Sequence, residues 1–248
     1  MRQLWRVLRW ALYLYVSVHA VVWVIYANPG MLFAYSHQAD GLTLHSVEPI
    51  DPEHADLVLT RVAKTLDASP LGGLKTSPSA YDTGNTWRTP LFFASVRQAG
   101  GVTYYPFSTR NAYLAGMDLA NDVLVKGPFR MTPPRSLSYY LVHEFTHLRI
   151  GELTGPIAYH LLPRWIMEGI CDVVALGVMD KAQIQNILDW QGTDLALMET
   201  YGSYPIERAL VSFAELDLGL SPSDLISDPI TRAEILERAT AKSKAGEL

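Results

Sequence analysis

The stretch His143-Glu144-Phe145-Thr146-His147 has the spacing HExxH. On an α-helix, residues four positions apart lie on the same face, about one turn from each other. The imidazoles of His143 and His147 can therefore reach one metal ion. Glu144 projects beside that ion, where its carboxylate can polarise a water molecule and accept a proton. The spacing thus predicts a metal site with Glu144 as the general base.

The residues around this stretch favour a metal site over a chance match. Leu141, Val142 and Leu148 flank the pentapeptide, so we expect a largely buried helix face. Two buried histidines and a glutamate are costly without a shared partner, and a metal ion is such a partner. The alternative is a helix that carries two unrelated histidines.

A catalytic metal site needs a third protein ligand and one open coordination position. A histidine six residues after His147 would be one solution, but position 153 is a leucine. Glu168 follows 21 residues after His147, in the second turn of a helix that we expect to begin at Pro163. We predict that Glu168 is the third ligand. Glu152 and His160 remain as alternatives.

Asp172 lies one helical turn beyond Glu168. Metal-bound imidazoles usually donate their other N–H to a carboxylate or a carbonyl, and we expect Asp172 to accept such a hydrogen bond. The alternative is an exposed surface aspartate. Cys171 is the only cysteine, which rules out a disulfide within the chain and a cysteine-rich zinc site. We therefore expect the metal to be held by His, Asp or Glu alone.

The N-terminus carries a run of 18 residues, from Trp10 to Ala27, without Asp, Glu, Lys or Arg. This is close to the roughly 20 residues that cross a bilayer core. Arg2, Arg6 and Arg9 precede the run, and the next basic residue is Arg61. The excess of positive charge before the run predicts a single-pass anchor with a cytoplasmic N-terminus and an extracytoplasmic remainder. A cleaved signal peptide is the alternative, although its apolar region is usually about 7–15 residues.

The rest of the chain predicts an α+β fold. Residues 1–28 are the expected transmembrane anchor and 29–50 a juxtamembrane linker. Residues 51–130 form a subdomain with a small mixed or antiparallel sheet, in which 91–96 and 101–105 are expected to pair as a hairpin. Residues 131–248 form a helical, metal-binding catalytic subdomain, because Pro or a capping residue precedes each apolar helical segment.

Composition excludes one class of partner. The 248 residues carry a formal net charge of −5, and no basic stripe interrupts the sequence. Proteins that bind nucleic acid present a concentrated basic surface to the phosphates. We therefore expect no nucleic acid partner.

These residues resemble the gluzincin branch of zinc metallopeptidases, the group that contains thermolysin and the aminopeptidases related to leukotriene hydrolase. The similarity covers roughly residues 135–220. It consists of the HExxH pentapeptide, the Trp-x-x-Glu-Gly pattern at 165–169, and Asp172. A tyrosine before a later apolar helix, Tyr204, resembles the residue that stabilises the tetrahedral intermediate, and Tyr201 competes for this role. No Gly-x-Met-Glu-Asn stretch matches the aminopeptidase element that binds a substrate amino terminus.

The resemblance implies a zincin-like fold and a membrane-anchored zinc peptidase. His143, His147 and Glu168 would bind Zn²⁺, Glu144 would be the base, and the substrate would be a peptide or protein. An intramembrane protease is disfavoured, because the helix around HExxH is too short and polar to span a membrane. The competing interpretation is a membrane-anchored binding or assembly protein that keeps the fold without activity.

Overall fold

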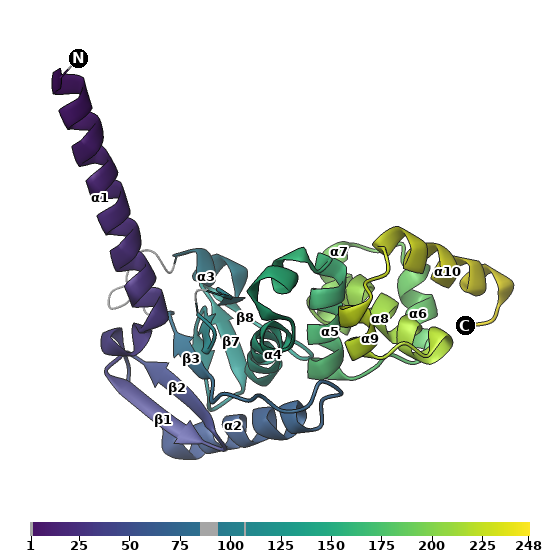
Figure 1. Ribbon diagram of the computed structural model, residues 1–248. Helices are drawn as coiled ribbons and strands as arrows, with labels where there is room; N and C mark the ends of the chain where they lie inside the picture. The colour runs from purple at the N-terminus through teal and green to yellow at the C-terminus, as the bar shows by residue number, and fades with distance from the viewer. Residues whose placement is uncertain (1, 85–93, 107) are drawn as a thin grey trace.

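The structure, a computed structural model, describes residues 2–84, 94–106 and 108–248. It has a mixed α+β architecture with one long helix, α1 (Arg2–Ala27), that extends away from the rest (Figure 1). Within the described residues, one helical segment, Gln3–Ile25, is long and apolar enough to cross a membrane. Its apolar window is 0% buried inside the protein. An N-terminal signal sequence also meets these criteria of length and composition, so they fit both a membrane anchor and a signal sequence.

A five-stranded sheet has the strand order β1-β2-β3-β5-β4. The strands are β1 (Tyr35–Ala39), β2 (Leu42–Ser46), β3 (Ser79–Asp82), β4 (Gly101–Thr103) and β5 (Asn111–Leu114). The inner strands β2, β3 and β5 run parallel, and each edge strand is antiparallel to its neighbour. Among the described residues, the edge strand β4 therefore pairs on one side only.

A second, smaller sheet lies beside the first. It has the order β6-β7-β8, with β6 (Met117–Asp118), β7 (Val123–Lys126) and β8 (Phe129–Arg130). Gly127 has a φ of 59°, which suits the tight turn between β7 and β8. The exposed side chain of Phe129 stands on this hairpin.

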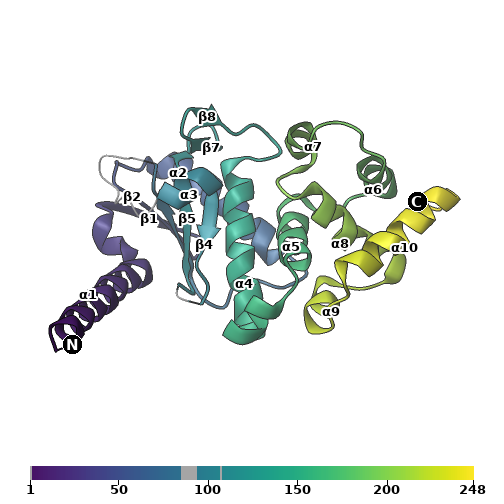
Figure 2. The ribbon, with the colours of Figure 1, turned by 90° about the horizontal axis from the view of Figure 1, so that it is seen from above.

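Helices cover the sheet and fill the C-terminal half. They are α2 (Pro52–Asp67), α3 (Ala94–Ala99), α4 (Leu137–Leu161), α5 (Arg164–Leu176), α6 (Lys181–Leu188), α7 (Asp194–Tyr201), α8 (Pro205–Leu218), α9 (Pro222–Ser227) and α10 (Arg232–Ala245), besides the 3-10 helix η1 (Pro29–Leu32). In Figure 2, α4 lies between the sheet and α5. Both flanks of α4 are thus covered, which explains why nearly every residue from 137 to 151 is buried.

Local chemistry explains where several helices begin. Asp51 caps α2 by accepting hydrogen bonds from the backbone N–H groups of Glu53 and His54. Asp180 and Gln183 form a reciprocal capping box at the start of α6. Residues 131–248, predicted to be helical, contain the helices α4 to α10, and β7 lies in the predicted sheet-containing part, 51–130.

Three sequence predictions differ from the structure. The expected linker at 29–50 is wrong, because it contains β1 and β2, both members of the main sheet. The expected strand at 91–96 is wrong at its described end: Ala94–Ala99 is a helix, and residues 91–93 lie outside the described residues. β4 instead pairs with β5. The helix α7 had no counterpart in the prediction.

Candidate metal centre

Helices α4 and α5 bring the three predicted ligands together. Nε2 of His143 lies 3.2 Å from Oε2 of Glu168, and Nε2 of His147 lies 3.4 Å from the same oxygen. The two histidines come from adjacent turns of α4 and the carboxylate from the second turn of α5. Both ring nitrogens therefore approach one carboxylate oxygen, in the part of α4 that is buried on both flanks.

The other nitrogen of each ring contacts a different group. Nδ1 of His143 lies 2.9 Å from Oδ1 of Asp172, and Nδ1 of His147 lies 3.4 Å from the hydroxyl of Tyr159. The tautomer with the proton on Nδ1 donates to these oxygens and leaves the lone pair of Nε2 facing Glu168. The geometry therefore suits rings that present Nε2 to a shared cation.

Asp172 connects several parts of the centre. Its side chain is 0% exposed, and besides His143 it accepts hydrogen bonds from the Tyr139 hydroxyl and, at 2.8 Å, from the backbone N–H of Tyr204. The alternative of an exposed surface aspartate is therefore wrong. One carboxylate fixes both a histidine of α4 and the residue that begins α8.

The cluster holds more acidic than basic charge. Burial lowers the pKa of His143, but the hydrogen bonds with Asp172 and Glu168 outweigh it and raise that pKa to about 10. Burial raises the pKa of Glu168, but the two histidines outweigh it and hold that pKa well below its usual range. Three carboxylates, those of Glu144, Glu168 and Asp172, surround two imidazoles. A bound cation would balance this excess of negative charge.

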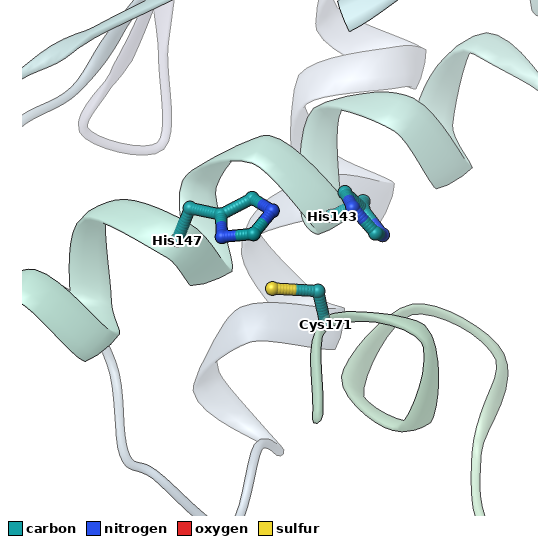
Figure 3. A group of neighbouring side chains, drawn as sticks. All are labelled: His143, His147 and Cys171. Carbon is teal, nitrogen blue, oxygen red and sulfur yellow. The ribbon is translucent and has the colours of Figure 1, made fainter. Parts of the chain in front are cut away.

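Cys171 also reaches the centre. One ligand atom from each of His143, His147 and Cys171 lies within 4.8 Å of the others, and all three residues are buried. Figure 3 shows the thiol pointing toward the helix that carries the two rings. The expectation that only His, Asp or Glu could contribute was too narrow, because Cys171 lies three residues after Glu168 on the same helix face.

Glu144 lies beside the centre, against the edge strand β4. A Cβ atom added to Gly101 of β4 would stand 2.6 Å from Oε1 of Glu144, so a larger residue here would displace this carboxylate from its position. Burial raises the pKa of Glu144, while the nearby charges of His147 and His143 oppose that rise. The carboxylate is held close to both histidines and the unpaired edge of the sheet.

Tyr204 and Tyr201 occupy different environments. The ring of Tyr204 stacks on His143, with centroids 5.4 Å apart, and lines the adjoining cleft. Tyr201 packs against the hydrophobic core, and its carbonyl accepts a hydrogen bond from Arg208. Of the two tyrosines, Tyr204 has its ring at the centre.

A close helix crossing brings Tyr204 there. A Cβ atom on Gly169 would stand 2.5 Å from the carbonyl oxygen of Glu207 in α8. The glycine after Glu168 therefore lets α5 and α8 approach each other closely. Tyr204 is the residue just before α8, so this approach carries its ring to the histidines.

The alternative ligands lie elsewhere. Glu152 accepts hydrogen bonds from the backbone N–H groups of Lys75 and Thr76 and pairs with Arg149. His160 is exposed. The structure brings neither side chain to the point where the two ring nitrogens meet Glu168.

Sequence reasoning missed Tyr159. Helix α4 is kinked at Gly155, where φ is 75°, and Pro156 follows. The kink redirects the chain so that the buried Tyr159 reaches His147. The Gly155-Pro156 dipeptide is a signal for such a break, but the partner of Tyr159 depends on the direction of the kink.

A cleft of about 610 Å³ opens from the centre along α4. Its walls include His143, Glu144 and Tyr204 at one end, the β7–β8 hairpin, and α7. In Figure 2, the hairpin and α7 lie near the same end of α4. Comparisons with protein-family models, curated proteins and solved structures found no match.

Proposed function

We propose that this chain is a membrane-anchored zinc peptidase with a zincin-like fold. The observation that carries the proposal is the approach of two imidazole Nε2 atoms to one oxygen of Glu168, with Glu144 beside them at the end of a cleft. Peptidase chemistry needs a Lewis acid, a base and access for a chain. This arrangement offers a position for each of the three.

The donor set fits zinc. Two imidazole nitrogens and one carboxylate oxygen are the ligands of several catalytic zinc sites, which keep a fourth position open. The excess of acidic groups around His143 and His147 favours a dication at this point. Zinc bound here supplies a Lewis acid that polarises a carbonyl oxygen and acidifies water.

The side chains of the protein then have distinct roles. Glu144 accepts the proton of the attacking water and passes it to the leaving amine, and its raised pKa brings it closer to the operating range of a base. The hydroxyl of Tyr204 donates to the oxygen that becomes negative at the carbonyl carbon. Asp172 holds His143 in orientation, and the unpaired edge of β4 offers backbone groups to an extended substrate.

The charges that flank α1 support an extracytoplasmic location for this activity. Arg6 and Arg9 precede the apolar run, so the positive-inside rule gives a cytoplasmic N-terminus and a catalytic part outside it. Intact mass spectrometry of the purified protein should find residues 1–27 attached. A mature chain that begins at Asn28 would mean that α1 is a signal peptide and not an anchor.

A peptide-library cleavage assay on the full chain in detergent tests the proposal. The wild-type protein should cleave, and Glu144→Gln should keep its zinc while its turnover falls by about three or more powers of ten, because the base is lost. Tyr204→Phe should lower kcat more than it raises KM. Cleavage by Glu144→Gln at the wild-type rate would remove Glu144 from the mechanism.

The proximity of Cys171 favours a second candidate. If its thiolate joined His143, His147 and Glu168, four protein ligands would close the site, as in structural zinc centres. The chain would then be a membrane-anchored binding or assembly protein without peptidase activity.

Cys171→Ala separates the two functions. The peptidase proposal expects this variant to keep its zinc and its cleavage rate. If four protein ligands close the site, Cys171→Ala should lose much of its zinc affinity, and the wild-type protein should not cleave peptides. Thermal unfolding of the variant controls for the loss of a buried side chain.

A further inference from the structure

Arg135 is a buried cation in the wall of the cleft. It is 8% exposed, and its Nε has no hydrogen-bond partner among the described residues. It lies directly before Ser136, which caps α4, and it lines the same cleft as His143 and Glu144. A buried N–H without an acceptor is costly, so the unpartnered Nε–H of Arg135 at a cleft wall indicates a ligand that supplies acceptors to this guanidinium.

The other charged groups of the cleft leave Arg135 available. Arg130 forms an ion pair with Asp118, and Lys126 adds a second positive charge on the hairpin. Glu199 of α7 also lines the cleft but is exposed. Among the described residues, no ion pair joins Arg135 to an acid. This end of the cleft is therefore positively charged, whereas the end at Glu144 is acidic.

The distance between the two ends suits a short peptide. His143 lies seven positions after Ser136, and helical rise gives roughly 10 Å along the axis of α4. An extended peptide advances about 3.3 Å per residue. About three residues of substrate would therefore span from the reacting carbonyl to the guanidinium.

We propose that Arg135 binds a carboxylate of the peptide substrate, about three residues from the bond that is cleaved. The inference rests on the proposed peptidase function and adds a substrate class to it. The planar fork of a guanidinium matches a carboxylate in two parallel hydrogen bonds, which a neutral amide cannot replace. The carboxylate can be the C-terminus of the peptide or the side chain of Asp or Glu.

Matched peptides test this inference by binding as well as by cleavage. The full chain in detergent, with Glu144→Gln to prevent turnover, is titrated with fluorescent peptides of one sequence. In the first pair, one peptide has a free C-terminal carboxylate and the other a C-terminal amide. In the second pair, one peptide has Glu and the other Gln three residues from the cleavage position. The same pairs are assayed for kcat/KM with active protein.

We expect tighter binding of the carboxylate member in at least one pair, and that pair identifies the source. Arg135→Met should weaken this member by about 10- to 100-fold, with its neutral partner nearly unchanged. Arg135→Lys should retain part of the preference, because it keeps the charge. Arg238→Met, at an exposed position on α10, is the matched control and should behave as the parent protein. Thermal unfolding and zinc content show whether each variant is folded.

Equal weakening of acidic and neutral peptides by Arg135→Met, or no carboxylate preference in the parent protein, would overturn the inference while leaving the peptidase proposal intact. Failure of the peptidase proposal alone would give a different result. If no peptide is cleaved but binding still prefers the carboxylate in an Arg135-dependent way, the inference stands and the peptidase proposal fails.

Discussion

Helix α4 carries two glutamates eight residues apart that have opposite surroundings. Glu152 receives the backbone N–H groups of Lys75 and Thr76 and pairs with Arg149 at 3.1 Å. Burial raises the pKa of Glu152, but these donors outweigh it and lower the pKa overall. Burial raises the pKa of Glu144 and no such set of donors reverses it. Glu144 is buried and Glu152 is half-buried, but only at Glu152 do hydrogen-bond donors and a paired arginine outweigh the effect of burial on the pKa.

The difference separates a structural cluster from a candidate functional one. At Glu152, Arg149 supplies the positive charge, and the cluster ties the loop before β3 to α4. At the metal centre, the nearest arginine to Glu168 is Arg164, whose side chain is 76% exposed and 3.5 Å away. The three carboxylates of the candidate centre thus have two histidines as their nearest positive partners, and the proposed metal ion would add the remaining positive charge.

The largest expected effect comes from exchanging a glutamate for glutamine in each cluster. Glu168→Gln should weaken zinc binding by more than about 100-fold, because it removes a charged ligand. The loss of a ligand should lower zinc affinity more than the loss of a group that only orients a ligand. Glu152→Gln, the matched change in the balanced cluster, should leave zinc affinity unchanged. Competition with a chromophoric chelator measures both. Equal zinc affinity in the two variants would erase the distinction between the clusters.

A smaller effect is expected at Asp172. Asp172→Asn keeps the shape but weakens the acceptor for Nδ1 of His143, so zinc affinity should fall by about 10- to 100-fold. The same titration measures the change. Thermal unfolding at saturating zinc controls for the lost contacts with Tyr139 and the backbone of Tyr204. Unchanged affinity in a folded variant would mean that Asp172 does not orient the ring.

Removing the hydroxyl of Tyr159 should have a weaker effect still. Tyr159→Phe deletes one long hydrogen bond to Nδ1 of His147, and a neutral hydrogen bond contributes about 0.5–1.5 kcal/mol. Zinc affinity should fall by about 2- to 10-fold. Tyr35→Phe, at an exposed position on β1, is the control. A loss as large as that of Asp172→Asn would assign Tyr159 a larger part in the centre.

The smallest expected effect is the pH dependence of stability from Glu152. Because its pKa is lower in the folded state, its contribution is complete above the ordinary glutamate range, about 4.3, and is lost as the pH falls through the folded value. In excess chelator, Glu152→Gln should be less stable than the wild-type protein by about 1 kcal/mol or less at pH 7. The difference should vanish in acid. Denaturant titrations measure it, and a difference that grows in acid would contradict this account.

Local patterns predicted the parts of the centre that depend on helical spacing. His143 and His147 lie one turn apart because of the helix period, and so do Glu168 and Asp172. Cys171 follows from the same rule, because it lies three residues after Glu168, but the prediction had limited the metal ligands to His, Asp and Glu. The position of Arg135 beside the cleft depends on how α4, α7 and the β7–β8 hairpin pack, which no local pattern encodes.

The sheet was harder to predict for a similar reason. β1 and β2 are joined by Asp40-Gly41, both with positive φ, and Asp-Gly between alternating residues is a hairpin signal that the linker interpretation overlooked. Ala94–Ala99 contains Ala, Arg and Gln, which favour helix, beside Val96, which favours strand. Whether β4 pairs with the segment before it or with β5 is decided by tertiary packing.

Zinc stoichiometry of the full chain, measured by elemental analysis after exposure to zinc and removal of the excess, tests the central claim most directly. The account predicts about one zinc per chain in the wild-type protein, retained in Glu152→Gln and lost in His147→Ala. A wild-type protein that binds no zinc, or a His147→Ala variant that keeps it, would contradict the claim that α4 and α5 form a metal centre.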